Sequence, residues 1–453
     1  MRIAHINVLA SLSTGRIAVD LCRMAMDKGH RALLCHARDH APADVPSYRI
    51  GTLAGVYTHI GLARLTDRSG FFSRHATRAL VRQLEGYKPD IVHLHNLHGY
   101  YLHLPTLFHY LKDSGVMVVW TLHDCWAFTG HCAYFTIARN APPLHAGPRR
   151  RAKQTAYGCD RWQGGCGKCR LKRLYPASWL LDQSARNWRE KRDLFTSLER
   201  MVLVTPSEWM LHQIERSFLK RYPAYALPNG LDLDVFRACA DEGYFSHVME
   251  FYKLERFGGR PIVLSVAAVW EERKGLYDLI ELAELLGEDY CVMVVGLDQY
   301  QIEALPPKTV YGYRRTANVR DLCALYTLAQ VYVSASHEES MGMTLLEAMA
   351  CGTQVLCYNA TAMPELVIPA VGRVVPIRDV EAMAQAVREM CAQPLAAADC
   401  RAHAEQYDIS ERYRAYMRLY ENMYRQGAPQ PAPKEPPREP RRKYRLSKRL
   451  RRP

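Results

Sequence analysis

Two glutamates in one short segment indicate a site for a ligand that carries a phosphate group. Glu339 follows an apolar run, and Glu347 lies eight residues later in a helical pattern that begins after Gly342, so both side chains should lie on one side of the helix. The N–H groups of Met343 and Thr344 would bind an anion between them. Such a site suits a ligand with a central diphosphate and a diol at each end. The alternative is that Glu347 only forms a surface ion pair.

Two adjacent basic residues could neutralise the same diphosphate. Arg273 and Lys274 follow the apolar run 262–267 and precede Gly275, which places them at the carboxyl end of a predicted strand. A pair of cations in a loop is more often solvated surface. Their position therefore carries the prediction, and their charge alone does not.

Cysteines gather in one region of the chain. Five of the fourteen cysteines lie within residues 125–169, among several glycines. Four of them offer a ligand set for a tetrahedral zinc ion that would hold together an insertion without a core of its own: Cys132, Cys159, Cys166 and Cys169. His131 or Cys125 could replace one ligand, and free thiols or a disulfide are the alternative.

Two other patterns resemble metal sites. His93, His95 and His98 lie close together in sequence, but His93 and His95 share one face of a predicted strand, so packing or a polar wall is the preferred interpretation. Asp232-Leu233-Asp234 matches an Asp-x-Asp metal signature. It follows a Pro-Asn-Gly turn, where ordinary loop chemistry is the better explanation, so we expect chemistry that needs no metal ion.

Short apolar runs alternate with amphipathic stretches in two series, which predicts crossover units and parallel sheets. The predicted strands are residues 3–7, 32–36, 91–95, 116–122 and 201–205, then 262–267, 291–295, 331–335 and 354–358. The predicted helices are residues 16–28, 72–87, 105–114 and 184–197, then 275–286, 319–328, 344–350, 380–391 and 409–424.

Two such series indicate an α/β protein with two doubly wound, Rossmann-like domains that face each other across a cleft. We expect an N-terminal domain over residues 1–225, with a Cys-rich basic insertion at about 125–175, and a second domain over residues 226–405. A helix at 406–426 and a Pro-rich, basic, disordered tail at 427–453 would follow. Ligands of such sheets bind at the carboxyl ends of the strands.

The chain resembles the retaining glycosyltransferases of family 4, which have the two-domain GT-B fold. The resemblance covers residues 1 to about 425, and its most specific mark is the glutamate pair in the segment 339–352. It continues in the segments 13–17, 228–232 and 363–366. The segments 90–99 and 121–126 are similar to a subgroup that makes bacterial surface polysaccharides.

The resemblance implies a role for each matching residue. Glu339 would contact hydroxyls of the transferred hexose, Glu347 the ribose of the nucleotide, and Lys274 with Arg273 the diphosphate of a UDP- or GDP-sugar. His123 would lie beside the anomeric centre. Acceptor-side residues would be Gly15, Asn96 and His98. The reaction would retain the anomeric configuration without a cofactor, and stabilisation of charge on the leaving phosphate would contribute most to catalysis.

One segment departs from the family pattern. The commoner sequence before Lys-Gly is Gly-Arg-Leu, whose arginine contacts the diphosphate. This chain has Ala268-Val269-Trp270 at that place. Arg273 is the nearest residue that could supply the missing charge.

Positive charge is confined to two segments. The net charge is +14, and residues 427–453 hold ten Lys/Arg against two Glu, while residues 139–173 hold ten against one Asp. The rest is close to neutral, so we expect no nucleic-acid partner but local contact with an anionic membrane, in addition to a glycan or lipid-linked acceptor. No run of 18 apolar residues and no signal-peptide pattern is present. We therefore expect a cytoplasmic protein, at the inner face of the membrane when bound.

Two further functions fit parts of the pattern. A GT-B nucleotide-sugar epimerase would share the fold and the donor contacts. A non-catalytic, zinc-stabilised adaptor for membranes or nucleic acid would use the basic segments. The adaptor is disfavoured because it has no physical reason to keep carboxylates beside an anion site.

Overall fold

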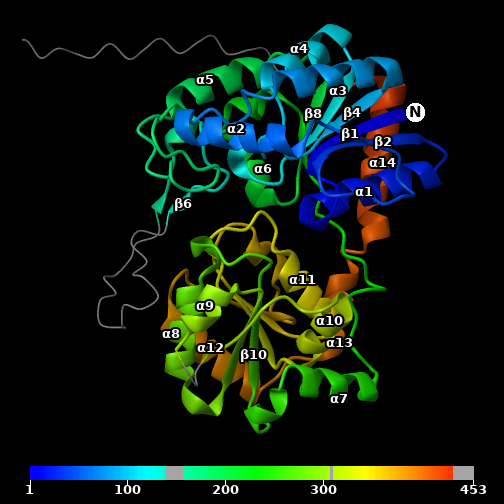
Figure 1. Ribbon diagram of the computed structural model, residues 1–453. Coiled ribbons are helices and arrows are strands. Elements are labelled where there is room, and N and C mark those ends of the chain that lie inside the picture. The colour runs from blue at the N-terminus through cyan, green and yellow to red at the C-terminus, as the bar shows by residue number, and fades with distance from the viewer. Residues whose placement is uncertain (138–156, 307–309, 432–453) are drawn as a thin grey trace, which may run out of the picture.

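The computed structural model contains two parallel β-sheets, each in its own α/β unit (Figure 1). It describes residues 1–137, 157–306 and 310–431. Most of the predicted basic segments, residues 138–156 and 432–453, lie outside the described residues. No helix in the described ranges is both long and apolar enough to cross a membrane.

The first sheet has seven strands in the order β3-β2-β1-β4-β5-β8-β9. All its pairs are parallel. Its strands are β1 (Arg2–Leu9), β2 (Arg31–Arg38), β3 (Ser47–Arg49), β4 (Ile91–Leu94), β5 (Met117–Thr121), β8 (Met201–Thr205) and β9 (Ala224–Ala226). A short antiparallel pair, β6 (Thr136–Ile137) and β7 (Tyr157–Gly158), lies in the insertion.

Helices cover both faces of this sheet, because side chains on a strand alternate between the faces. Ala4 and Ile6 of β1 belong to the core beneath five helices, whereas Ile3 belongs to the core on the opposite face, beneath two. The five are α2 (Leu53–Thr66), α3 (Arg74–Tyr87), α4 (Leu104–Ser114), α5 (Ser184–Phe195) and α6 (Glu208–Glu215). The two are α1 (Leu12–Asp27) and α14 (Ile409–Gln426).

The second sheet has six parallel strands in the order β12-β11-β10-β13-β14-β15. They are β10 (Ile262–Val266), β11 (Cys291–Val295), β12 (Val310–Tyr313), β13 (Val331–Ser334), β14 (Val355–Tyr358) and β15 (Gly372–Val375). Its helices are α7 (Glu242–Phe251), α8 (Leu276–Leu286), α9 (Gln299–Glu303), α10 (Val319–Leu328), α11 (Met343–Ala350), α12 (Val380–Ala392) and α13 (Ala397–Glu405). One continuous core joins them.

Helix α14 returns from the second unit to the first (Figure 1). Tyr413, Tyr416 and Tyr420 on this helix are at most 2% exposed and pack in the core beneath α1. These three tyrosines thus form a packing surface for the sheet of the first unit. At the N-terminal end of α14, Leu231 forms a β-bridge with Asp408, which ties the linker between the units to the start of this helix.

The predicted fold class, two doubly wound α/β domains, is confirmed by the two parallel sheets and their helices. The predicted division at residue 225 falls within β9, the last strand of the first sheet. The domain bounds 1–225 and 226–405, followed by a helix at 406–426, remain a proposal.

Candidate active site

Lys274 is held at the carboxyl end of β10 by a backbone that requires glycine next to it. Gly275 has a φ of +74°, and a Cβ there would lie 2.0 Å from the carbonyl oxygen of Ala335, which follows β13. The N–H of His337 also donates to the carbonyl of Arg273 at 2.7 Å. These two close approaches fix the loop before α8 against the loop after β13.

Glu339 meets both predicted cations. Its carboxylate accepts a hydrogen bond from Nζ of Lys274 and lies 3.8 Å from the guanidinium of Arg273. Burial alone would raise the pKa of Glu339, but Lys274 and Arg273 hold that pKa below its ordinary value. The carboxylate is therefore ionised at neutral pH. The structure brings these three residues together as the sequence predicts.

Helix α11 begins directly after this cluster. Gly342 has a φ of +101° and forms the N-cap, so the first helical N–H groups, those of Met343 and Thr344, point out of the helix end. About one turn further along α11, Glu347 accepts a hydrogen bond at 2.9 Å from the hydroxyl of Tyr326. Burial raises the pKa of Glu347, and Arg16 of α1, in the first domain, acts in the opposite direction. Glu347 is thus a half-buried carboxyl, and within the described residues it forms no ion pair of the kind that the alternative predicts.

His123 follows the end of β5 in the first domain. It retains 8% exposure, and its Nε2 lies 3.1 Å from Nδ1 of His95. Burial lowers the pKa of His123 to about 4. His123 is therefore a neutral imidazole at pH 7, which can donate one hydrogen bond and accept another.

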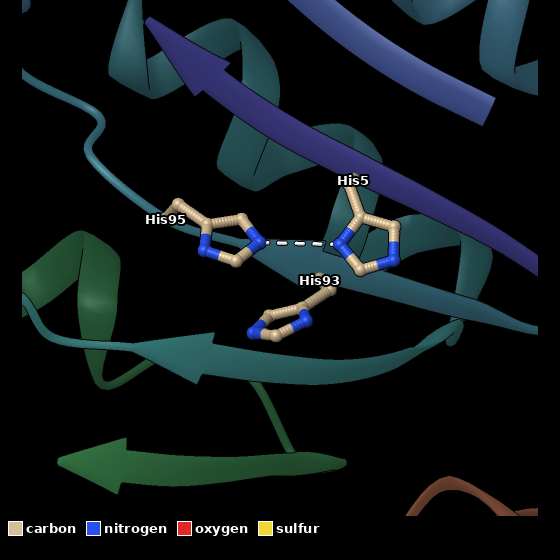
Figure 2. Close-up of side chains that lie close together, drawn as sticks. All are labelled: His5, His93 and His95. Atoms are coloured by element: carbon tan, nitrogen blue, oxygen red, sulfur yellow. Dashed lines mark hydrogen bonds between the residues drawn. The ribbon is translucent and has the colours of Figure 1, made fainter. Parts of the chain in front are cut away.

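The predicted histidine cluster has a different membership in the structure. His5, His93 and His95 bring ring nitrogens within 4.8 Å of one another (Figure 2), whereas His98 lies apart from them. His93 contacts the hydroxyl of Tyr420 at 2.5 Å and that of Thr121 at 2.8 Å. Both nitrogens of His93 thus have protein partners.

His98 is held by a carboxylate and a phenol. Its Nε2 lies 2.6 Å from Oδ2 of Asp124, and its Nδ1 lies 2.8 Å from the hydroxyl of Tyr175. Burial would raise the pKa of Asp124, but His98 and the N–H of Trp126 keep that pKa below its ordinary value. His98 and Asp124 therefore form a fixed polar pair beside His123.

Gly15 and Asn96 are joined through Asn7 at the end of β1. The amide of Asn7 donates to Oγ1 of Thr14 at 3.3 Å, and its oxygen accepts from the N–H of Asn96, also at 3.3 Å. A Cβ on Gly15 would lie 3.1 Å from the carbonyl oxygen of Leu9. These contacts position the predicted acceptor-side residues at the carboxyl ends of β1 and β4.

Glu338, which no sequence pattern singles out, joins the two domains. Its side chain is buried and accepts hydrogen bonds from the N–H of Phe135 at 3.0 and 3.3 Å. The thiol of Cys125 lies 3.8 Å from the same carboxylate. Arg273 also stacks on Tyr134, with 3.9 Å between the guanidinium carbon and the ring centroid. The loop after β5 therefore packs directly against the donor-side cations.

Arg273, which the sequence offers in place of the arginine missing before Lys274, has several contacts of its own. Besides stacking on Tyr134, it donates to the carbonyl of Glu338 at 3.0 Å. A second cation reaches the divergent segment: Arg315 donates to the carbonyl of Ala268 at 3.3 Å. Sequence spacing could not reveal Arg315, which lies in the loop after β12.

The four predicted zinc ligands converge, but less tightly than the three histidines. Cys132 is buried; burial raises the pKa of its thiol, and the thiols of the other three cysteines raise that pKa further. Among the described residues, only the histidine group has three potential ligand atoms within 4.8 Å of one another. The Cys132 region is packed by Lys191, whose ammonium donates to the carbonyls of Trp126 and Thr129.

Comparisons with known proteins agree with this geometry. Residues 14–235 match the family model Glycosyltransferase Family 4, and residues 250–407 match Glycosyl transferases group 1. WcaC, named as a colanic acid biosynthesis glycosyl transferase of Escherichia coli strain K12, is 22% identical over 414 residues, which cover 87% of this chain and 92% of WcaC.

Two solved structures share the fold. The sucrose-phosphate synthase of Thermosynechococcus elongatus has a TM-score of 0.65 at 16% identity and covers 94% of this chain and 99% of its own. The Anabaena protein HepE in complex with UDP has a TM-score of 0.61 at 15% identity, with 93% of this chain and 100% of its own covered. The two family models together span both domains, and the chain belongs to the GT-B glycosyltransferases of family 4.

Proposed function

We propose that this glycosyltransferase moves a hexose from a nucleotide-diphosphate sugar to a glycan or lipid-linked acceptor in surface polysaccharide biosynthesis, with retention of configuration. The observation that carries the proposal is the cluster of Glu339, Lys274 and Arg273 beside the N-terminus of α11. The likeness to WcaC supports the pathway class, and the UDP complex of HepE supports the donor class.

The charges assign a role to each group. Lys274, Arg273 and the N-terminus of α11 would stabilise negative charge on the leaving diphosphate, and such electrostatic stabilisation usually contributes most to the rate of this kind of chemistry. Glu339, kept ionised by the two cations, would accept hydrogen bonds from sugar hydroxyls. Glu347 would accept from the ribose diol. None of these roles requires a metal ion, and we propose metal-independent transfer.

His123 would face the reacting centre from the other domain. Because its imidazole is neutral at pH 7, it would position the sugar by hydrogen bonding. Gly15, Asn96 and His98 would line the acceptor side. The leaving phosphate would assist deprotonation of the acceptor hydroxyl, so the site needs no separate strong base.

Replacement of Glu339 tests the assignment. Glu339→Gln keeps the shape but removes the charge, and we expect kcat/KM for sugar transfer to fall about 100-fold. The matched control is Glu389→Gln, which breaks an exposed ion pair with Arg373 in the same domain and should leave transfer unchanged. Equal activity of Glu339→Gln and the wild type, with both folded, would refute the role.

An exposed apolar surface supports contact with a membrane. Trp179, Leu180 and Leu181 are 60%, 65% and 43% exposed, and the N–H groups of Trp179 and Leu181 donate to carbonyls of α2. Helix α2 adds its own exposed leucines beside them. Contiguous apolar surface of this kind is uncommon on proteins that stay in water.

Basic residues flank this apolar surface. Lys168, Arg170 and Arg173 are exposed in the described part of the insertion. Cations around an apolar patch suit an anionic lipid surface. We therefore propose a peripheral protein on the cytoplasmic face of the membrane, where a lipid-linked acceptor would be presented.

Sedimentation with anionic phosphatidylglycerol vesicles tests this surface. The double variant Trp179→Glu with Leu180→Glu should reduce pelleting, because two carboxylates replace apolar area that the lipid would cover. The control is Phe251→Glu with Tyr300→Glu, two residues equally exposed in the second domain. A variant without residues 427–453 measures how much the basic tail contributes to vesicle binding. Equal pelleting of all four proteins would exclude the proposal.

We also propose that Cys132, Cys159, Cys166 and Cys169 bind a structural zinc ion. The convergence of the other three thiols on Cys132 supports it, and binding requires the sulfur atoms to move closer together. Elemental analysis of the purified protein should find one zinc per chain, and Cys166→Ser with Cys169→Ser should lose it. Cys239→Ser with Cys391→Ser, in the second domain, is the control. A wild type without zinc would disprove the site.

A nucleotide-sugar epimerase is the competing function. It would release nucleotide or convert the donor without an acceptor. The transferase should release the nucleotide only when an acceptor glycan is present, so a nucleotide-release assay with and without acceptor separates the two.

A further inference from the structure

A chain of buried imidazoles leads to His123. Nδ1 of His5 lies 3.1 Å from Nε2 of His95, and Nδ1 of His95 lies 3.1 Å from Nε2 of His123. His5 is fully buried on β1 and His95 is 1% exposed. Figure 2 shows the first of these contacts, with the rings of His5 and His95 directed edge to edge. We call His5, His95 and His123 the imidazole chain.

The ring planes fit N–H···N hydrogen bonds along this chain. The planes of His95 and His123 differ by 10°, and those of His5 and His95 by 21°. Both pairs of centroids are 5.4 Å apart. Rings stacked face to face at that spacing could not bring two nitrogens within 3.1 Å, so the rings meet edge to edge in nearly one plane.

The protons of the chain must be ordered together. Burial lowers the pKa of His5 to about 3 and of His123 to about 4, and places that of His95 well below its ordinary value. Each ring is therefore neutral at pH 7, with one N–H and one acceptor nitrogen. If Nδ1 of His5 donates, then Nδ1 of His95 donates and Nε2 of His123 accepts. The opposite order reverses all three tautomers.

The far end of the chain selects between these orders. Nε2 of His5 is buried and meets no hydrogen-bond partner among the described residues. In the first order this atom is an unsatisfied acceptor, and in the second it is an unsatisfied N–H. Orphaned N–H groups are the rarer of the two in folded proteins, so the first order is favoured.

We propose that His5 and His95 are positioning residues that hold the proton of His123 on Nδ1. The atom Nδ1 of His123 makes no hydrogen bond within the described residues and is not one of the buried atoms without a partner, so it lies on the exposed part of this side chain. His123 then presents a hydrogen-bond donor to the reacting groups.

This inference rests on the proposed function, because it gives His123 a chemical character there. A donor N–H suits the oxygen of a hexose hydroxyl or a phosphate. A protonated Nδ1 cannot accept a second proton as a base would, so His123 would not remove the proton of the acceptor hydroxyl through this atom. That task would then remain with the leaving phosphate.

Nitrogen NMR reads the tautomer directly. In the protein labelled with ¹⁵N-histidine, two-bond ¹H–¹⁵N spectra at pH 7 distinguish protonated from unprotonated ring nitrogens, and His123→Gln identifies the signals of His123. We expect a protonated Nδ1 and an unprotonated Nε2. A protonated Nε2 in the wild type overturns the proposal. The NMR measurement needs neither a nucleotide sugar nor an acceptor glycan. Its result therefore does not depend on whether sugar transfer is detected.

Two matched variants test the role of His5. His5→Leu removes the end of the chain, and we expect mixed tautomers of His123 and a kcat about tenfold lower, from the loss of one hydrogen bond. His93→Leu removes an equally buried imidazole that pairs with His5 in the strand register but has no hydrogen bond to His95. It should leave the tautomer unchanged. Loss of the tautomer in both variants would assign His5 only a packing role.

Discussion

At the scale of residues, the sequence revealed the charged groups of the donor side. It did not reveal buried polar residues whose partners lie far away in the sequence. The glutamate pair was predicted from its spacing and the two cations from their position after a predicted strand, and Glu339 does contact Lys274 and Arg273. Glu338 and His5 were not predicted, because the role of a buried polar residue depends on the residues that it contacts in the folded chain. Their partners lie 203 and 90 positions away. No local pattern reports such contacts.

Buried neutral histidines should make the protein unstable in acid. Burial lowers the pKa of His59 to about 3 from an ordinary 6.5. Between these two pH values, His59 is protonated in the unfolded chain and neutral in the folded chain. The stabilisation is complete above pH 6.5 and is lost as the pH falls towards 3. At pH 5 the loss is about 2 kcal/mol for each such histidine.

Urea unfolding at pH 7 and pH 5 measures this effect. His59→Leu should lose about 2 kcal/mol less than the wild type between the two pH values, because one proton no longer distinguishes the states. The comparison uses the change with pH and not the absolute stability, so packing lost in the variant cancels. An identical pH dependence of both proteins would contradict the prediction.

At the scale of elements, buried strands and strongly amphipathic helices were predicted to within a few residues. β8 and β11 have the expected bounds, as does α10. Helix α2 was missed. It buries only Val56, His59 and Ala63, and its exposed side also carries apolar residues. Its sequence therefore has no apolar stripe with a helical period. The short edge strands β3, β9, β12 and β15 were missed as well, because three or four residues carry little pattern.

Gly275→Ala should disturb the placement of Lys274. The new Cβ would lie 2.0 Å from the Ala335 carbonyl oxygen, so one of the two loops must move. We expect a loss of more than about 2 kcal/mol of unfolding free energy, beyond the cost of a positive φ alone, and weaker binding of the donor nucleotide.

Gly258→Ala is the control for this change. Gly258 has a φ of +60° and a ψ of 33°, in the same left-handed region as Gly275, and a Cβ there meets no atom within 4 Å. It should cost about 1 kcal/mol and leave nucleotide binding intact. Equal effects of the two substitutions on stability and binding would show that the contact with Ala335 does not matter.

At the scale of the whole molecule, the alternation of strands and helices was sufficient to predict two facing domains. It could not predict how they touch. The domains meet through Glu338 with Phe135, Arg273 with Tyr134, and Glu365. The two oxygens of Glu365 accept from the N–H groups of Glu208 and Trp209, at 2.9 and 2.6 Å. A carboxylate of the second domain thus caps helix α6 of the first.

Glu365→Ala should loosen the contact between the domains. Loss of a helix cap costs about 1 kcal/mol, and here the cap also holds one domain to the other. We expect a larger radius of gyration by small-angle X-ray scattering. Asp379→Ala removes the N-cap of α12 within the second domain, with a similar cost in stability and no change in radius. A radius unchanged by Glu365→Ala would argue against this latch.

The decisive test of the donor site is a thermal-shift titration with UDP, GDP, ADP and their sugars, on the wild type and Lys274→Met. A ligand at one hundred times its dissociation constant stabilises the folded protein by about 2.7 kcal/mol. We predict that one nucleotide series raises the melting temperature of the wild type and that Lys274→Met abolishes or greatly reduces the shift. No shift with any series, or equal shifts in both proteins, would contradict a donor site at Lys274 and Glu339.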